Sequence, residues 1–179
     1  MSPVQSSQRF RRMDAFEQRL CLPFNRAAER RAIQSFFAAV SRLGDGVLWY
    51  TLMAILPLVD GWDGAHASLH MAIVALLGLA IYKWMKGHLL RSRPYVTHAA
   101  IRVHTAPLDV CSFPSGHTLH AVAFTLVSTA YYPQLAWVTV PFTVLVALSR
   151  VVLGLHYPSD VAIGALIGAS LALGSLHLL

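Results

Sequence analysis

Charged residues are scarce in this chain. Lys, Arg, Asp and Glu make up 12% of its 179 residues, whereas a soluble domain carries about 25%. So few charges cannot cover a soluble surface. Hydrophobic residues make up 56% of the chain, and its mean hydropathy is +0.55. The composition excludes an ordinary soluble domain and indicates a membrane protein.

The sequence also lacks the features of several other protein classes. Its two cysteines, Cys21 and Cys111, have no metal-type spacing, so we expect two free thiols. Residues 1–31 contain many arginines and no long apolar core, so we expect a part of the mature protein rather than a secretory signal. The net charge is +6, but no nucleic-acid-binding motif accompanies it. We therefore expect an anionic substrate or a membrane surface as the partner, and no nucleic acid.

The apolar segments predict five transmembrane helices. They cover residues 47–59, 67–84, 117–132, 135–153 and 161–179. A span needs about 20 residues, so the first segment is short, and it also contains Pro57. In the last segment Gly164, Gly168 and Ala172 recur every four residues, a spacing that lets helices approach closely in lipid.

Residues before the first span repeat apolar side chains at helical spacing. This pattern fits an amphipathic helix in the membrane interface or an ordinary packed helix, and we expect Gly44-Asp45-Gly46 to end it. The apolar positions are Ile33, Phe36, Phe37, Val40 and Leu43. We predict an all-α, polytopic membrane helix bundle in one domain, residues 1–179. Residues 1–45 form its basic N-terminal segment and interfacial helix, and residues 46–179 form the transmembrane bundle.

Three polar clusters fall on one side of the membrane in this topology. The second and fourth spans end there, and the third and fifth begin there. Ionisable residues in or beside a span are costly and therefore indicate function. The clusters lie at 86–94, 114–117 and 149–160 and contain Lys86, Arg93-Pro94, Pro114-Ser115-Gly116-His117, Ser149-Arg150, His156 and Asp160.

Five of these residues suit phosphate binding. Lys86, Arg93 and Arg150 supply positive charge, and the planar arginine fork matches phosphate oxygens. Ser115 and Gly116 precede an expected helix, whose free backbone N–H groups attract an anion. Together they predict a cradle for a phosphoryl group.

Two histidines and one carboxylate suit the transfer of that group. Asp160 follows His156 by four residues, so both can lie on one helical face. A carboxylate on one imidazole nitrogen leaves the other nitrogen free to attack. His117 can protonate the leaving oxygen. The residue types therefore fit covalent transfer through a phosphohistidine.

In order and spacing, the clusters resemble the three signature motifs of the type 2 phosphatidic acid phosphatase (PAP2) family. The motifs in this chain are Lys86-x6-Arg93-Pro94, Pro114-Ser115-Gly116-His117 and Ser149-Arg150-x5-His156-x3-Asp160. The resemblance implies an integral-membrane lipid phosphatase that works without a metal or other cofactor. It implies that His156 is the nucleophile, that Asp160 orients it and that His117 is the acid. The phosphate-binding residues that it implies are Lys86, Arg93, Ser115, Gly116 and Arg150.

The family resemblance leaves several questions open. The substrate class includes phosphatidic acid, phosphatidylglycerol phosphate and polyprenyl diphosphates such as undecaprenyl diphosphate. A lipid phosphotransferase with the same site is an alternative, as is a non-catalytic protein that binds phosphate lipids. Vanadium haloperoxidases also resemble the motif set, but they are soluble and much larger. The oligomeric state is not specified either.

The remaining histidines and two loop arginines match no motif. No zinc pattern such as HExxH is present, so we expect ordinary structural roles for these histidines. Arg91 and Arg102 fit either an extension of the positive field or a solvated loop. The seven histidines are His66, His70, His88, His98, His104, His120 and His177.

The distribution of basic residues bears on the orientation of the chain. With five spans, all fourteen Lys and Arg residues fall on the catalytic side, and the opposite loops hold Asp60 and Asp63. The positive-inside rule then favours a cytoplasmic active site in a bacterial inner membrane. Many bacterial proteins of the family that this chain resembles act on the outer face. The face therefore stays open at this stage.

Overall fold

The computed structural model describes residues 8–107 and 109–178, and this part of the chain contains helices and connecting segments but no strand. The predicted all-α class is confirmed. The elements, in order, are α1 (Gln8–Ala27), α2 (Arg31–Arg42), the π-helix η1 (Leu43–Val47), α3 (Leu48–His88), α4 (Pro94–Thr97), α5 (Gly116–Tyr131), the 3-10 helix η2 (Pro133–Leu135), α6 (Ala136–Val152) and α7 (Pro158–His177).

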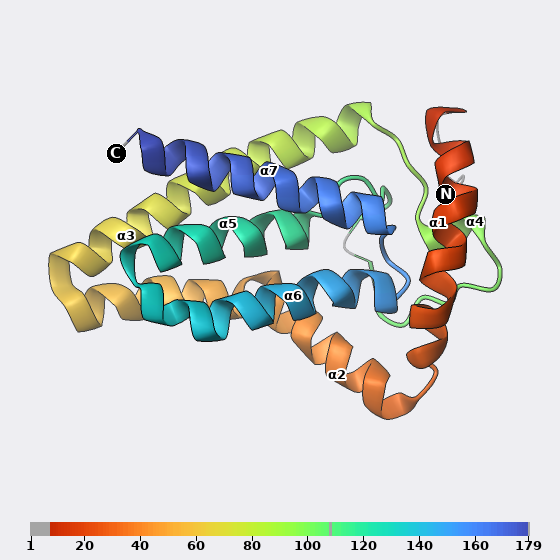
Figure 1. Ribbon diagram of the computed structural model, residues 1–179, viewed down its shortest axis with the longest axis horizontal. Coiled ribbons are helices and arrows are strands. Elements are labelled where there is room, and N and C mark those ends of the chain that lie inside the picture. Colours follow the sequence, from red (N-terminus) through yellow and green to blue (C-terminus); the bar gives the residue numbers. More distant parts are fainter. Residues whose placement is uncertain (1–7, 108, 179) are drawn as a thin grey trace.

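The long element α3 consists of two helical arms joined by a sharp bend. Asp60 and Gly61 have non-helical backbone angles, and Gly61 has a φ of 53°, a value that glycine adopts without a Cβ clash. The arms, residues 48–59 and 62–88, fold back beside each other, with the bend at the left end of Figure 1. Ser68 Oγ donates a hydrogen bond of 2.8 Å from one arm to Met53 O of the other. The bend lies between the first two predicted spans, in the loop that holds Asp60 and Asp63.

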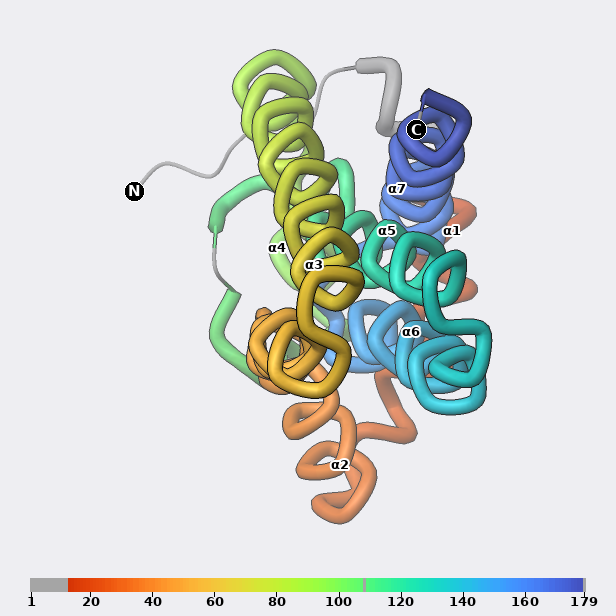
Figure 2. Tube along the Cα trace, turned by 90° about the vertical axis from the view of Figure 1, so that its left-hand side faces the viewer, coloured from red at the N-terminus to blue at the C-terminus, as the bar shows by residue number. Residues whose placement is uncertain are grey.

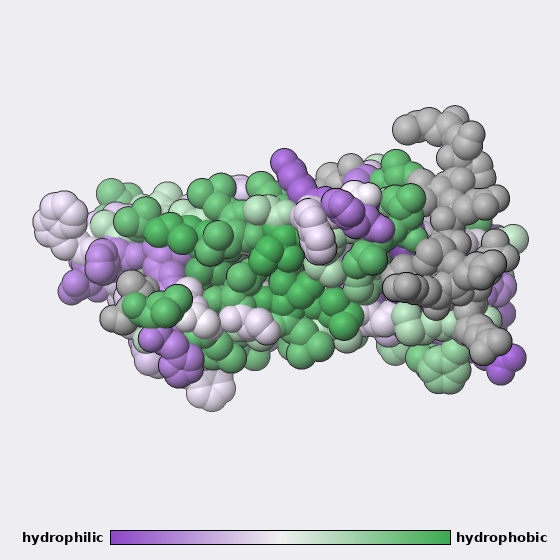
Figure 3. Space-filling view, turned by 90° about the horizontal axis from the view of Figure 1, so that it is seen from above, coloured by the Kyte–Doolittle hydropathy of each residue, from purple (hydrophilic) through white to green (hydrophobic). Residues whose placement is uncertain are grey.

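Five helical passes connect the two ends of the bundle: the two arms of α3, then α5, α6 and α7 (Figure 1). Figure 2 shows α5 between α3, α6 and α7. By length and composition, three helical stretches of the described chain suit a membrane span: Arg31–His88, which contains both arms, Pro133–Val152 and Pro158–His177. Figure 3 shows hydrophobic surface over the middle of the bundle and hydrophilic groups toward its ends. The polytopic membrane bundle is confirmed, and the number of five spanning helices stays a prediction.

Glycines on α7 allow it to pack directly against the backbone of α5. A Cβ atom on Gly164 would lie 2.5 Å from Ser115 O, and one on Gly168 would lie 2.2 Å from Leu119 O. The close packing predicted from the four-residue spacing is confirmed. It also brings the start of α7 to the start of α5, where Ser115 N donates a 3.0 Å hydrogen bond to Asp160 O.

Helix α1 crosses the right-hand end of the bundle in Figure 1. The sequence pattern did not reveal this helix, because most of the side chains that it buries are polar. Asp14, Glu17, Cys21 and Asn25 recur at helical spacing and are all buried. A buried stripe of this kind produces no apolar periodicity in the sequence.

Helix α2 packs against the bundle on one face, and its interfacial location stays a prediction. Val40 is buried, whereas Phe36 is half exposed, so one face packs on the bundle and the other faces outward. The prediction that Gly44-Asp45-Gly46 breaks this helix is confirmed. Helix α2 ends at Arg42, and Gly46, with a φ of 129°, makes the kink that separates it from α3.

Candidate active site

The structure brings the three sequence clusters together at the end of the bundle that α1 crosses. Lys86 lies in the last turn of α3, and Ser115 caps the start of α5. Arg150 lies in the last turn of α6, and Asp160 lies in the first turn of α7. The eight predicted site residues therefore come from four separate passes and the loops that join them.

His156 lies in the short connection between α6 and α7, and its side chain is almost completely buried. Gly154, with a φ of 75°, turns the chain, and the N–H groups of Leu155 and His156 both donate to Arg150 O at 3.0 Å. Arg93 Nη1 donates to Leu155 O at 2.7 Å and lies 3.3 Å from His156 Nε2. A guanidinium and an imidazole from two different motifs are thus in direct contact.

The charge state of His156 follows from these surroundings. Burial lowers its pKa well below the ordinary value of 6.5, and the positive charges of Arg93, Arg150 and Lys86 lower it further. The imidazole is therefore neutral at physiological pH, with a free lone pair, as a nucleophile requires.

Asp160 is close to His156 but does not form the predicted direct hydrogen bond. Its Oδ2 lies 3.7 Å from His156 Nδ1, which is too long for such a bond. Among the described residues His156 Nδ1 has no hydrogen-bond partner. Asp160 Oδ2 instead accepts from Tyr157 N at 2.8 Å, and Oδ1 accepts from Arg91 at 2.5 Å. The carboxylate is held beside the imidazole by these two contacts.

Arg91 is fully buried in an ion cluster that joins α1 to α7. Its guanidinium lies 2.8 Å from Asp14, 2.5 Å from Glu17 and 2.5 Å from Asp160. The solvated-loop interpretation of Arg91 is wrong, because Arg91 is buried against two carboxylates of α1, a helix that the sequence did not reveal, and one carboxylate of α7. Arg102, in contrast, is exposed on the loop.

A carboxylate that the sequence did not identify lies between two of the phosphate-binding candidates. Asp109 forms an ion pair with Lys86, and its Oδ1 accepts from Arg93 at 2.7 Å. Tyr82 donates to Oδ2 at 2.5 Å. Burial raises the pKa of Asp109, but the Lys86 and Tyr82 hydrogen bonds and the nearby positive charges lower it to about 2. The sequence did contain a signal, since Asp109 is the only acidic residue between positions 63 and 160.

The remaining phosphate-binding candidates surround the start of α5. Ser115 is buried, and its side chain caps the helix. Gly116 lies against Tyr82, so a Cβ atom there would lie 2.6 Å from the ring. Arg150 is buried, with Nη1 donating to Ser41 Oγ at 2.6 Å. Its Nε has no hydrogen-bond partner in the described chain, which leaves a buried donor for an anion.

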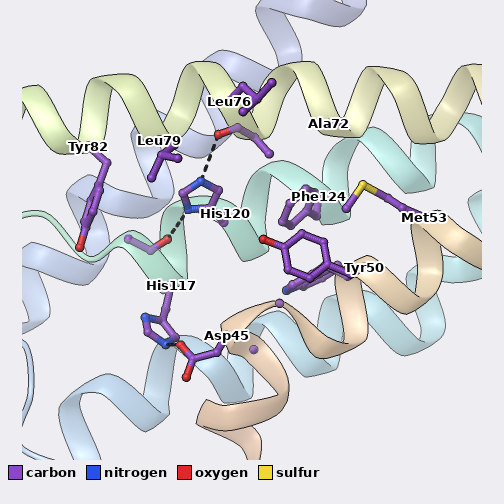
Figure 4. A pocket seen from close by; sticks show the side chains of 15 residues that line it. Asp45, Tyr50, Met53, Ala72, Leu76, Leu79, Tyr82, His117, His120 and Phe124 are labelled. Carbon is purple, nitrogen blue, oxygen red and sulfur yellow. Dashed lines mark hydrogen bonds and ion pairs between the residues drawn. The ribbon is translucent and has the colours of Figure 1, made fainter. Parts of the chain in front are cut away.

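An apolar cavity of about 430 Å³ leads to His117. Its walls are the two arms of α3 and one face of α5 (Figure 4). Tyr50 and Leu76 line it and are largely exposed on the bundle surface, so the cavity opens sideways, toward the bilayer. At its polar end the His117 imidazole forms an ion pair with Asp45.

Several unassigned residues have the structural roles that the sequence predicted. Cys21 and Cys111 are free thiols. His70 connects Tyr131 and Ser175 across the bundle. His120 lines the cavity, with its ring nitrogens 2.9 Å and 3.2 Å from backbone carbonyls of α5 and α3. Within residues 8–107 and 109–178, no group of three or more His, Cys, Asp or Glu side chains is arranged to hold a metal ion.

Comparison with known proteins shows the family to which the chain belongs. The PAP2 superfamily pattern matches residues 67–179. Decaprenylphosphoryl-5-phosphoribose phosphatase of Mycobacterium tuberculosis is 34% identical over 132 residues, which are 73% of this chain and 72% of that protein. Undecaprenyl-diphosphatase BcrC of Bacillus subtilis is 33% identical over 101 residues, 56% of this chain and 51% of that protein. The crystal structure of Aquifex aeolicus LpxE has the same fold, with a TM-score of 0.77 and 24% identity over 89% of this chain and 93% of that one. The chain therefore belongs to the PAP2 superfamily, and it is an integral-membrane phosphatase of that family, as its motifs predicted.

Proposed function

We propose that this chain removes a phosphoryl group from a membrane lipid through a covalent intermediate on His156. The observation that carries the proposal is the contact of 3.3 Å between Arg93 Nη1 and Nε2 of the buried, neutral His156. A guanidinium beside a nucleophilic nitrogen can hold the phosphoryl oxygens while that nitrogen attacks phosphorus.

In the first step, Nε2 of His156 forms a bond to phosphorus as the bond between phosphorus and the lipid oxygen breaks. The lipid oxygen leaves with the bonding electron pair and takes a proton from His117. Lys86, Arg93 and Arg150, with the N–H groups at the start of α5, stabilise the charge on the transferring oxygens.

In the second step, a water molecule attacks the phosphohistidine. The water oxygen bonds to phosphorus, the bond from phosphorus to Nε2 breaks, and the neutral His117 takes a proton from the water. Inorganic phosphate leaves, and both histidines return to their initial states. An acceptor alcohol in place of water would give a phosphotransferase, which analysis of the products distinguishes.

The apolar cavity supports a substrate with its hydrophobic part in the bilayer. The cavity joins the bundle surface to His117, so a lipid tail can lie between the arms of α3 while the phosphate reaches the cations. The names of the two bacterial relatives described above both refer to polyprenyl-linked substrates. We therefore propose a polyprenyl-linked phosphate or diphosphate as the first substrate to test.

The test is phosphate release by the purified protein in detergent. The panel contains undecaprenyl diphosphate, a polyprenyl monophosphate, phosphatidylglycerol phosphate and phosphatidic acid, assayed with and without a chelator. We expect turnover of at least one lipid, inhibition by orthovanadate and loss of turnover in His156→Ala. His66→Ala, at an exposed position near the α3 bend, is the matched control. Full activity in His156→Ala contradicts the proposed nucleophile.

We also propose that the catalytic end faces the cytoplasm. The basic residues of α2, the end of α3 and the following loop lie at that end, and the bend of α3 carries Asp60 and Asp63. The test uses Ala100→Cys and Asp63→Cys, two exposed positions at opposite ends. Both are placed in a chain whose two native cysteines are replaced by alanine.

An impermeant thiol reagent applied to intact cells distinguishes the two orientations. We expect labelling of Asp63→Cys alone. Labelling of Ala100→Cys alone places the active site on the outer face, and the proposed orientation is then wrong. Permeabilised cells, in which both positions must react, provide the control for reactivity.

A further inference from the structure

Asp45 faces the site from the short π-helix η1, a segment to which the sequence assigned only a role as a helix end. Its Oδ1 forms an ion pair with Nε2 of His117. Figure 4 shows this contact and shows the other ring nitrogen of His117 turned away from Asp45. Asp45 also lines the polar end of the apolar cavity. It therefore lies where the oxygen of a leaving lipid must pass.

The backbone around Asp45 is constrained on both sides by glycine. A Cβ atom on Gly44 would lie 2.8 Å from the side chain of Val146. Gly46 has a φ of 129°, and a Cβ atom there would lie 2.4 Å from the Tyr50 ring. The kink at Gly46 turns the carboxylate of Asp45 out of the path of the two flanking helices and toward His117.

The charges around His117 show what this carboxylate does. From α6 and the loop before α4, the positive charges of Arg150 and Arg93 act on the imidazole. These cations suit a phosphate, but they oppose a proton on His117, which the acid role needs. Asp45 is the acidic group in contact with the ring. An anion on one ring nitrogen stabilises the imidazolium and fixes its orientation.

We propose that Asp45 is a positioning residue that orients His117 and favours its protonated form, with Nδ1–H directed to the leaving lipid oxygen. This inference rests on the proposed function, because it assumes that His117 is the acid. The α2–η1 segment that carries Asp45 precedes residues 67–179, the part that matches the superfamily pattern. The acid of the family motif thus depends on a residue from outside the matched region.

The test exploits the leaving group. An alkoxide leaves poorly and needs a proton from the acid, whereas p-nitrophenolate leaves without one. We compare kcat/KM for phosphatidic acid and for p-nitrophenyl phosphate in detergent, because this ratio reports the first step, up to departure of the leaving group, and not the later hydrolysis of the phosphohistidine. For Asp45→Asn we expect a loss of about 10- to 100-fold on phosphatidic acid, since a general acid contributes ~10²–10⁴-fold. On p-nitrophenyl phosphate we expect a change below about threefold, because no acid assistance is lost there.

Three further variants serve as controls for this result. Asp45→Glu keeps the carboxylate and should restore at least part of the rate on phosphatidic acid. Asp63→Asn removes the same charge beside the α3 bend, at the opposite end of the bundle, and should change neither rate. His117→Ala should show the same leaving-group pattern as Asp45→Asn, with a larger loss.

The outcomes separate this inference from the proposed function. Equal losses on both substrates in Asp45→Asn, or an Asp45→Glu variant no better than Asp45→Asn, would overturn the inference alone. If His117→Ala loses both activities equally, its assignment as the acid fails first. If His156→Ala keeps either activity, the nucleophile is wrong, whatever Asp45 does.

Discussion

Replacement of Asp109 by asparagine should tighten phosphate binding. In the structure its carboxylate occupies the place of an anion between Lys86 and Arg93 and accepts a further hydrogen bond from Tyr82. A phosphate that binds both cations must displace this carboxylate. Asparagine has the same shape but no charge, so it competes less well for the two cations.

The size of the effect follows from the stability of the existing contact. The pKa of Asp109 falls from 3.8 to about 2. At about 1.36 kcal/mol for each pKa unit, the contacts favour the ionised carboxylate by about 2.5 kcal/mol. The neutral hydrogen bonds of the substituted asparagine would keep about 1 kcal/mol of this. Asp109→Asn therefore weakens the competing contact by ~1.5 kcal/mol. This corresponds to about a tenfold rise in apparent phosphate affinity, because the two cations are more often free to bind phosphate.

The assay measures KM for the lipid substrate and the inhibition constants of orthovanadate and inorganic phosphate. In Asp109→Asn all three should fall by about tenfold, with kcat unchanged or higher. Asp63→Asn, at the far end of the bundle, controls for the change in net charge. A rise in KM together with a fall in kcat would refute the reasoning, because Asp109 would then orient Lys86 and Arg93 rather than compete with the phosphate.

Three other predictions concern packing, the buried ion cluster and pH. Gly168→Ala places a Cβ atom 2.2 Å from a backbone oxygen. It should destabilise the protein by about 1–3 kcal/mol in detergent melts. A Cβ atom on Gly174 would have nothing within 4 Å, so the control Gly174→Ala should not destabilise the protein. Arg91→Ala leaves three buried carboxylates without their cation and should lower the free energy of unfolding by about 3–5 kcal/mol. The control Arg102→Ala, on the exposed loop, should change it by less than about 0.5 kcal/mol. Because burial and nearby cations lower the pKa of His156 well below 6.5, the acid limb of kcat/KM should lie below that pH. The same residue should lower the free energy of unfolding as pH falls through 6.5, because there the unfolded chain binds a proton that the folded chain does not.

The sequence was informative where hydrophobic pattern and motif chemistry agree. Apolar segments separated by polar turns predicted the bundle, and the four-residue spacing of Gly164 and Gly168 predicted the close packing of α7 against a neighbouring helix. The topology then placed the three motif clusters at one end, where the structure has them. These features follow from the local order of residue types, and a single sequence displays that order directly.

Features that depend on contacts between distant parts of the chain were not visible in the sequence. Helix α1 buries the carboxylates Asp14 and Glu17 instead of an apolar stripe, so its periodicity is hidden. Arg91 resembled a solvated loop residue because its partners lie more than 60 residues away. The spacing of Asp160 and His156 predicted their proximity, but not the competition from Tyr157 N and Arg91 for the carboxylate oxygens.

The residues that hold the motif side chains in place therefore lie in a different part of the chain from the motifs. The motif residues come from the matched region, but Asp45 faces His117, Ser41 holds Arg150, and Glu17 helps to hold the Arg91 cluster. All three supports precede residue 67, where the superfamily match begins. The motifs fix which groups surround the phosphate, and the N-terminal segment influences their charge and orientation. A chimera that joined residues 67–179 of this chain to the N-terminal segment of another PAP2 protein would retain every motif. It would still lose the partner of His117 unless that segment supplied an acid at the position of Asp45.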